Sequence, residues 1–552
     1  MPCSLDSRCD NTSEDALEIQ DTGAGAMRYL GIFACLFMLA CPAGSQAPEG
    51  EAPAEIAAED HEDHLGDHGR VAFETTCNEE AEDYFERGLA ALHHMMYADA
   101  KAIFEAATEA DPECAMAYWG VAMTNFQPIW EAPTEEQLEA GQAAVEIAMD
   151  LGGGAEREDR YIATVEAFFA DPDVEEGADA AAIYAERTRS WKESVRELHE
   201  AEPEDVDAAA FLGLAMLAYQ ERLVTPADDR DFEVEKQAGA MLEGYLDDHP
   251  EHPGLYHYII HIYDFPQLAH KGVEVAHAYD DLAPHTPHAL HMPSHIFVRL
   301  GEWEETVEWN IRSAEAALNH PVNGTTSIHY PHALDYKMYG YLQLGQHEEA
   351  RETLEKVRAI DDVEVAFGSA YGIAAAQARY YLERGAWEGA AELEENSPAA
   401  LDWDAFPGAQ AIFHYARGLG AARTGELEQA RAELEAIEGA VAALEEDADL
   451  YWKTMTEALA KAVEGWIAYA EGDVARALEL MDEGAQLEES LEKHPTTPGE
   501  VLPVRELHGD LLLEEGRLEQ AREAYETSLE RTPNRRNPLE RLEQVEEAQG
   551  TS

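Results

Sequence analysis

The pattern of apolar and polar residues divides the chain into a long helical part and a different N-terminal part. From about residue 79 onward, apolar positions follow a helical period almost throughout. Ala, Leu and Glu dominate this part and runs of β-branched residues are few, a composition that favours helix over strand. The pattern therefore predicts an all-α protein.

Small and aromatic residues recur at fixed spacing within the helical part. The first set is Tyr84, Gly88, Ala91, Ala100, Phe104, Ala107 and Pro112. Gly88 and Ala100 are small where the two helices of a hairpin would touch, and Phe104 would fill the space around them. Pro112 would end the second helix, because proline breaks a helix interior. This is the spacing of the tetratricopeptide repeat, a helical hairpin of about 34 residues.

The same frame recurs in the C-terminal half of the chain. Good copies are Gly509, Leu512, Ala521, Tyr525, Ser528 and Pro533, then Gly465, Ala468, Ala477 and Met481, then Gly418, Ala421, Ala430 and Leu434. Weaker copies are Tyr341, Ala350 and Leu354, and Ala378, Tyr381 and Ala390. Repetition at this period predicts an α-solenoid, a superhelix of antiparallel hairpins in which each hairpin packs only on its neighbours.

The repeat frame and the composition divide the chain into segments. Pro133, Gly152 to Gly154 and Pro172 break the frame, so the segment around them is either a helical insertion or a set of degenerate repeats. The segments are 1–41 (signal region), 42–76 (flexible acidic, histidine-containing tether), 77–130 (repeats), 131–207 (insertion or degenerate repeats), 208–360 (histidine-rich repeats), 361–545 (C-terminal repeats) and 546–552 (tail).

An apolar run of about ten residues from Gly31 to Ala40 is too short to span a bilayer and suits the core of a signal peptide. Residues 1–26 are too acidic for the positively charged N-terminal region of a signal peptide. One interpretation places them upstream of the true start codon. The run ends at Cys41 and resembles a bacterial lipoprotein signal, which implies lipidation of Cys41; the alternative is simple secretion. We expect an exported protein that is periplasmic or anchored to a membrane only through lipid.

The segment after Cys41 contains the tract D-H-E-D-H-L-G-D-H, with His61, His64 and His68. Histidine and aspartate in a short tract can bind divalent metals, and the alternative is a polar linker without such a role.

Of six cysteines, only Cys77 and Cys114 lie in the body of the chain. Both fall at the start of first helices in successive hairpins, so we consider a disulfide between them, with two unpaired thiols as the alternative.

The charge of the chain is strongly negative, with 37 Lys and Arg against 114 Asp and Glu, which gives −77. The acids are spread along the whole chain, so they predict a solvated acidic surface and favour adaptation to high salt, which would screen their repulsion. The alternative is an acidic protein from an ordinary bacterium. Such a surface repels phosphate, so we expect no nucleic-acid partner and favour a basic peptide, a cation or a metal.

Thirteen of the 23 histidines fall between His249 and His332. The sequences P-G-L-Y-H-Y-I-I-H-I-Y from Pro253, P-H-A-L-H-M-P-S-H-I-F from Pro287 and P-H-A-L-D-Y-K-M-Y-G-Y from Pro331 align as successive repeats. Equivalent positions are then His257, His291 and Asp335, followed one helical turn later by His261, His295 and Tyr339. Further candidate ligands are the histidines near these helix starts: His252, His285, His288, His329 and His332.

First helices line the concave face of a tetratricopeptide stack, so we expect His257, His261, His291, His295 and Asp335 to converge there. Imidazole and carboxylate are suitable ligands for a divalent transition metal such as zinc, nickel, copper or iron. The alternatives are a groove for a peptide or other ligand and a hydrogen-bonded structural ladder. Pro293 lies within one of these helices, so that helix would begin late or kink.

The sequence contains no G-x-S-x-G, H-E-x-x-H or glycine-rich phosphate loop. These missing motifs do not favour an enzyme, although the sequence leaves the question open.

The stretches that begin at Cys77, Asp111 and Pro287 resemble an uncharacterised group of exported bacterial tetratricopeptide repeat proteins. The resemblance covers roughly 77–350 and implies a repeat solenoid. The leading hypothesis is an exported, lipid-anchored scaffold that binds a protein or peptide in its concave groove. The alternative is a metal-binding protein or metal-dependent enzyme that uses the concave histidines.

Overall fold

The computed structural model describes residues 68–130, 132–175, 177–178, 180–219, 231–279, 282–394, 398–446 and 449–551. The expected signal region with Cys41, and His61 and His64 of the tether, lie outside the described residues. All described residues belong to one compact unit of the chain. Among the helices of this part, none is long and apolar enough to cross a bilayer.

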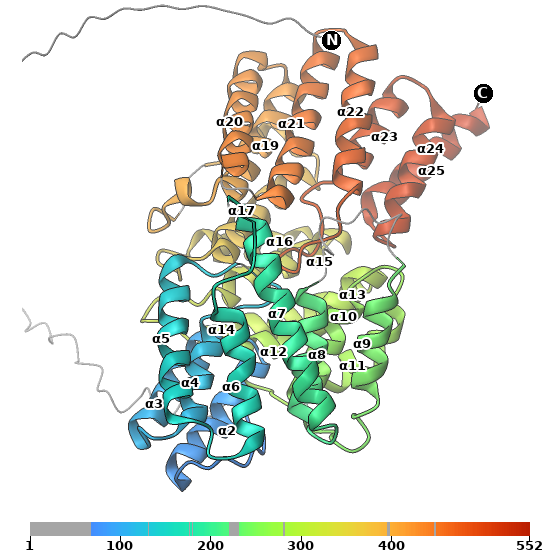
Figure 1. Cartoon of the computed structure of the whole chain (residues 1–552). Helices are drawn as coiled ribbons and strands as arrows, with labels where there is room; N and C mark the ends of the chain where they lie inside the picture. The colour runs from blue at the N-terminus through green and yellow to red at the C-terminus, as the bar shows by residue number, and fades with distance from the viewer. Residues whose placement is uncertain are drawn as a thin grey trace, which may run out of the picture. The chain divides into compact units, whose positions relative to one another are not determined.

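The first hairpin shows how the sequence produces the repeat (Figure 1). Helix α2 (Glu79–His93) begins after Asn78, whose side chain accepts hydrogen bonds from the free backbone N–H groups of the first turn. Helix α3 (Tyr97–Ala110) returns antiparallel to it. A Cβ atom on Gly88 would lie 2.8 Å from the ring of Phe104, so the glycine lets the two helices approach. The small and aromatic positions therefore act as the sequence predicted.

The remaining helices continue this alternation, and consecutive helices pack in pairs. The helices up to the centre are α4 (Ala115–Thr124), α5 (Glu135–Leu151), α6 (Glu156–Phe169), α7 (Ala180–Ala201), α8 (Val206–Ala218), α9 (Glu233–Glu243), α10 (Pro253–Tyr263), α11 (Ala269–Ala278), α12 (Pro287–His291), α13 (Pro293–Leu300) and α14 (Trp303–Ala317). Helices α5 to α7 occupy most of the segment 131–207, and each packs against the helix before it and the helix after it.

The C-terminal half has the same arrangement. Its helices are α15 (His329–Gln343), α16 (His347–Arg358), α17 (Phe367–Leu382), α18 (Trp387–Ala391), a short 3₁₀ helix (Trp403–Ala405), α19 (Pro407–Thr424), α20 (Leu427–Glu446), α21 (Leu450–Ala470), α22 (Val474–Glu489), α23 (Val504–Glu514), α24 (Leu518–Arg531) and α25 (Arg536–Thr551). Gly509 would place a Cβ atom 2.6 Å from the ring of Tyr525, so this hairpin uses the same contact as the first. Within the described residues, β structure is limited to two isolated bridges. The prediction of an all-α solenoid is confirmed.

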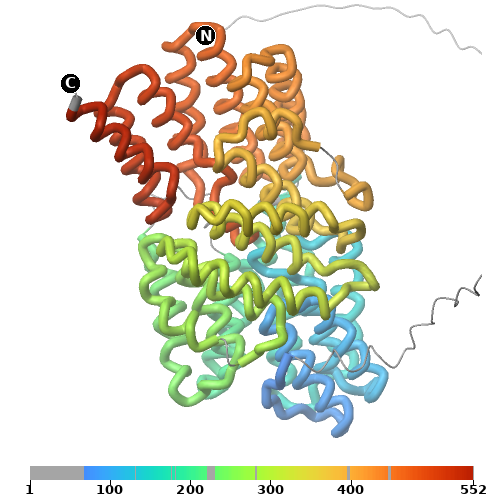
Figure 2. Tube along the Cα trace, turned by 180° about the vertical axis from the view of Figure 1, so that it is seen from behind, coloured from blue at the N-terminus to red at the C-terminus, as the bar shows by residue number. Residues whose placement is uncertain are grey.

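The histidine-bearing helices are covered on both sides, so hairpins do not pack only on their neighbours. Helix α2 contacts α10, which is far away in the sequence. Figure 2 shows the blue N-terminal and green central segments in the same half of the molecule. On the other side, the loop between α22 and α23 packs onto α15 and α17. The Tyr336 hydroxyl donates to the carbonyl oxygen of Thr497 at 2.9 Å, and Arg379 donates to that of Gly499 at 2.6 Å. The chain thus folds back over its own concave face.

Residues 68–76 are packed against the helices, which corrects the expectation that the tether extends to residue 76. Val71 and Phe73 are buried in the core, and His68 bonds Asp99 at 2.8 Å and Thr286 at 3.0 Å. Next to this segment the structure joins Cys77 and Cys114 in a disulfide, with their Cα atoms 4.9 Å apart. The disulfide links the start of α2 to the start of α4 and so connects two successive hairpins.

Candidate functional site

The four histidines aligned between repeats lie inside the molecule. His257 and His261 are on α10, His291 ends α12 and His295 is on α13; each is at most 1% exposed. They therefore do not line an open groove, because the chain folds back over the face that carries them. Pro293 separates α12 from α13, in agreement with the interruption that its position predicted.

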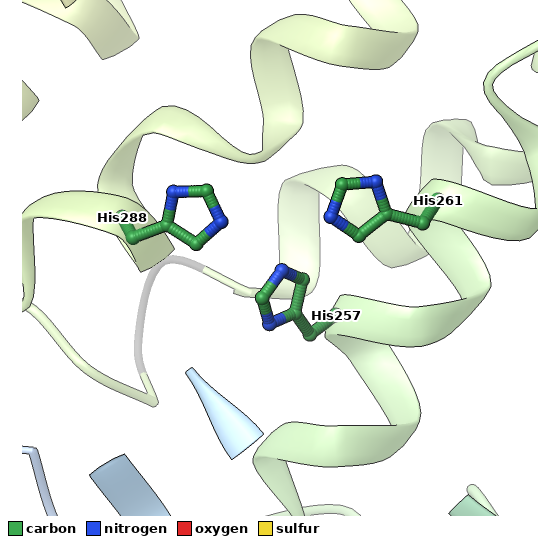
Figure 3. Close-up of side chains that lie close together, drawn as sticks. All are labelled: His257, His261 and His288. Atoms are coloured by element: carbon green, nitrogen blue, oxygen red, sulfur yellow. The ribbon is translucent and has the colours of Figure 1, made fainter. Parts of the chain in front are cut away.

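The structure divides these histidines into two groups and adds one histidine to each. His257 and His261 converge with His288 of α12, and one ring nitrogen from each residue lies within 4.8 Å of the others (Figure 3). His291 and His295 converge in the same way with His332 of α15. Both added residues are among the further candidate ligands that the sequence placed near helix starts. We call the first set the α10 group and the second the α13 group.

Hydrogen bonds orient the α10 group. His257 Nδ1–H donates to the carbonyl oxygen of His93 at 2.6 Å, which leaves a lone pair on Nε2. That Nε2 atom and both ring nitrogens of His288 are buried without a hydrogen-bond partner among the described residues. Trp130 covers His288, with ring centroids 5.2 Å apart. The group thus contains polar atoms that the surrounding protein does not satisfy.

The α13 group is more strongly tied to its surroundings. Asn310 Nδ2 donates to a backbone carbonyl, so its Oδ1 faces His291 Nδ1 at 2.7 Å and must accept from it. Asp264 Oδ2 lies 2.9 Å from His295 Nδ1 and accepts from it likewise. In these tautomers, the Nε2 atoms of His291 and His295 each have a lone pair, and the two atoms are 3.0 Å apart. Two facing acceptors repel, so this contact requires a proton or a metal cation between them.

Asp264 keeps a negative charge inside the protein. Burial alone would raise the pKa of Asp264, but Lys493 and Arg299 hold it well below its usual range. Lys493 Nζ donates to Oδ2 at 2.9 Å and Arg299 Nε donates to Oδ1 at 2.8 Å. An ionised carboxylate on the far nitrogen of His295 makes that imidazole a stronger ligand.

Burial lowers the pKa of four of the six histidines in the two groups. It lowers the pKa of His257 to about 3, and it lowers the pKa of His288, His291 and His332 well below the usual value. His329 borders the α10 group, with its ring centroid 5.2 Å from that of His288, and burial lowers its pKa to about 4. Neutral imidazole is the form that binds metal ions.

Asp335 is in neither group, which corrects the expectation that it joins the histidines. Its Oδ1 accepts from Arg379 Nε at 2.9 Å, in a pair whose side chains are both fully buried. The concave face of α15 contributes His332 instead, nearly one turn earlier on the helix. Burial raises the pKa of Asp335 to about 6.

Two carboxylate–histidine clusters were not predicted. Asp207 Oδ1 accepts from His93 Nε2 at 2.9 Å and from His252 Nε2 at 3.0 Å. The other cluster consists of His68, Asp99 and His320. Both connect segments more than 30 residues apart, so no local spacing could have revealed them. Their carboxylates accept from imidazoles, which gives them a structural explanation.

An open groove of about 510 Å³ lies beside the α10 group. Its wall includes aromatic side chains (Tyr97, Trp130, Phe367 and Phe406), the carboxylates of Asp99 and Glu364, and His329. Val365 at its edge is 64% exposed. The groove combines apolar surface with two carboxylates and one ammonium group, that of Lys101.

Comparison with known proteins identifies the repeat. A family model described as tetratricopeptide repeat matches residues 503–535, the hairpin of α23 and α24. No curated protein matches the chain significantly. Similar solved structures include yeast Tom70 (12% identity, 85% of this chain and 96% of that chain covered, TM-score 0.37) and a human IFIT1 dimer with m7Gppp-AAAA (13%, 88% and 99%, 0.37).

These structural likenesses are too distant to carry functional information. The family match covers the hairpin of α23 and α24, and helical hairpins continue on the N-terminal side of it through the described residues. Arrays of this kind serve as scaffolds for protein–protein interaction. Residues 503–535 match the tetratricopeptide repeat, and the described part of the chain is an all-α fold of stacked helical hairpins.

Proposed function

We propose that this protein is an exported, lipid-anchored scaffold that binds a basic, apolar segment of a partner protein. The observation that carries the proposal is the open groove beside the α10 group. The buried histidines cannot touch a partner, so binding is assigned to this neighbouring surface.

The chemistry of the groove supports a segment with both apolar and cationic side chains. Its aromatic wall offers apolar area for a peptide side chain, and aromatic residues are common at the centres of protein interfaces. Asp99 and Glu364 lie in the same wall, and the chain as a whole has a charge of −77. A Lys or Arg side chain would meet an attractive potential on approach, whereas an acidic segment would be repelled.

Site-specific photo-crosslinking would test this proposal. A benzophenone amino acid at Val365 should crosslink one partner in cells, and the same residue at Leu450 should not. Leu450 is a matched control, because it is 57% exposed and does not line the groove. The purified partner should then bind wild-type protein and the Leu450→Arg variant but not the Val365→Arg variant. Equal binding to both variants, or an acidic crosslinked segment, would contradict the proposal.

Export and anchoring rest on different observations. The apolar run from Gly31 to Ala40 ends at Cys41, as in a lipoprotein signal. A disulfide between Cys77 and Cys114 persists in oxidising compartments, which supports export. The apolar run contains a second cysteine, Cys35, which serves as a control. Labelling with a fatty acid should mark the wild-type protein and a Cys35→Ser variant, and both should fractionate with membranes. The Cys41→Ser variant should lose the label; retention of the label in this variant would refute anchoring through Cys41.

A further inference from the structure

We propose that His257, His261 and His288 form a binding site for one divalent transition-metal ion. This inference does not depend on the proposed partner binding, since the site is buried and the groove is open. The ion class is that of Zn²⁺, Ni²⁺ and Cu²⁺, which favour imidazole nitrogen.

The geometry is close to that of a metal site. One nitrogen from each of the three rings lies within 4.8 Å of the other two, and the rings face a common centre (Figure 3). In a tetrahedral zinc site with bonds of about 2.0–2.1 Å, ligand nitrogens are about 3.3 Å apart. Rotation of the side chains would close a remaining difference of at most about 1.5 Å. Three imidazoles leave the fourth position to water or another bound molecule.

Unsatisfied polar atoms point to a ligand in this space. His257 Nε2 and both nitrogens of His288 are buried without hydrogen bonds among the described residues. Buried polar groups in folded proteins are nearly always paired, so each such atom requires an explanation. A metal ion would accept the lone pairs of His257 Nε2 and one His288 nitrogen together. Close packing alone does not account for them, because apolar side chains would fill the same space at lower cost.

The surroundings also prepare the ligands. The hydrogen bond from His257 Nδ1–H to the carbonyl oxygen of His93 fixes the tautomer whose Nε2 lone pair faces the centre. Backbone carbonyls commonly orient metal-binding histidines in this way. Desolvation keeps the imidazoles of His257 and His288 neutral, the state that binds metal.

The groove supplies a route to the site. His329 and Trp130 line the groove, and both ring centroids are 5.2 Å from that of His288. Asp99 and Glu364 in the same groove would attract a cation to this side of the cluster. Side-chain motion of Trp130 and His329 would then admit the ion.

Zinc titration of the full chain without a histidine tag tests the proposal. The protein is stripped with a chelator and titrated with Zn²⁺ in molar KCl and excess Mg²⁺, which occupy surface carboxylates. Calorimetry and metal analysis should show one equivalent that disappears in both His257→Asn and His288→Asn. The His270→Asn variant, changed at an exposed histidine, should bind as wild type does.

Circular dichroism verifies that each variant is folded. The wild-type result is decisive without any variant: absence of tight Zn²⁺ binding to the folded protein would overturn the proposal. Zn²⁺ binding that survives unchanged in folded His257→Asn and His288→Asn would overturn it too. If the wild-type protein binds Zn²⁺ as expected but crosslinks no partner through position 365, the proposed function is refuted and the metal site is not.

Discussion

Acidification should weaken the fold through the buried histidines, and His257 allows the size of the effect to be worked out. Its pKa falls from 6.5 in the unfolded chain to about 3 in the folded protein, because burial opposes its charge. Below pH 6.5 the unfolded chain binds a proton that the folded protein rejects. Stability from this residue is therefore present above pH 6.5 and lost as the pH falls. Between pH 7.5 and pH 5.0 the loss is about 2 kcal/mol.

Other groups add to this change or oppose it. His329, with a pKa of about 4, contributes a further loss of about 2 kcal/mol over the same range. Asp335 acts in the opposite direction, since burial raises its pKa to about 6 and the folded protein takes up a proton near that pH. Its contribution is a gain of about 1.4 kcal/mol at pH 5.0. The total is a sum of opposed effects, so a variant must isolate the histidine.

The His257→Asn variant isolates the contribution of His257 to the pH dependence of stability. Asparagine keeps a donor for the carbonyl oxygen of His93 but cannot titrate. Urea unfolding of metal-free protein, followed by circular dichroism, should show a smaller acid loss in this variant than in wild type, by about 2 kcal/mol. The exposed His270→Asn variant should retain the wild-type dependence. The same acid loss in His257→Asn and wild type would refute the assignment of a buried, neutral His257.

Three more predictions concern the fold. Removal of the disulfide by Cys77→Ser and Cys114→Ser should lower stability by about 4 kcal/mol, from its sequence separation of 37, and thermal melting would measure this; an unchanged melting temperature would contradict it. Gly88→Ala should destabilise by about 1–3 kcal/mol through overlap with Phe104, whereas Gly439→Ala, which meets open space, should be neutral or stabilising in the same melts. The melting temperature should rise between dilute buffer and molar KCl, because salt screens the charge of −77; equal curves would exclude the salt adaptation.

The repeat could be predicted from the sequence because its contacts are local. Gly88 and Phe104 meet within one hairpin, so their spacing carries the information. The i, i+4 spacing also placed His257 and His261 on the same side of α10, where both contribute to one group. Periodicity sufficed for these two contacts, which lie within one hairpin and within one helix.

The covering of the concave face could not be predicted, because it depends on contacts between distant residues. His257 bonds the backbone of His93, which is 164 positions away, and Tyr336 bonds Thr497 over 161 positions. Repeat alignment therefore placed the histidines on a groove that the folded chain closes. Asp335 failed for a related reason, since alignment could not show that Arg379 of α17 would pair with it.

The packing of residues 68–76 had a signal that composition concealed. Val71 and Phe73 are apolar residues in an otherwise polar stretch, and both are buried. The prediction of a tether rested on the Ala, Pro, Gly and Glu content of the residues before them. Individual apolar side chains were a better guide here than average composition.

X-ray absorption at the zinc edge of Zn²⁺-loaded protein in solution tests the central claim about the buried histidines most directly. The account predicts nitrogen ligands at about 2.0–2.1 Å with the outer-shell scattering of imidazole rings. This signal should decrease in the His288→Asn variant and stay unchanged in His270→Asn. A shell of oxygen ligands alone, identical in wild type and His288→Asn, would contradict it.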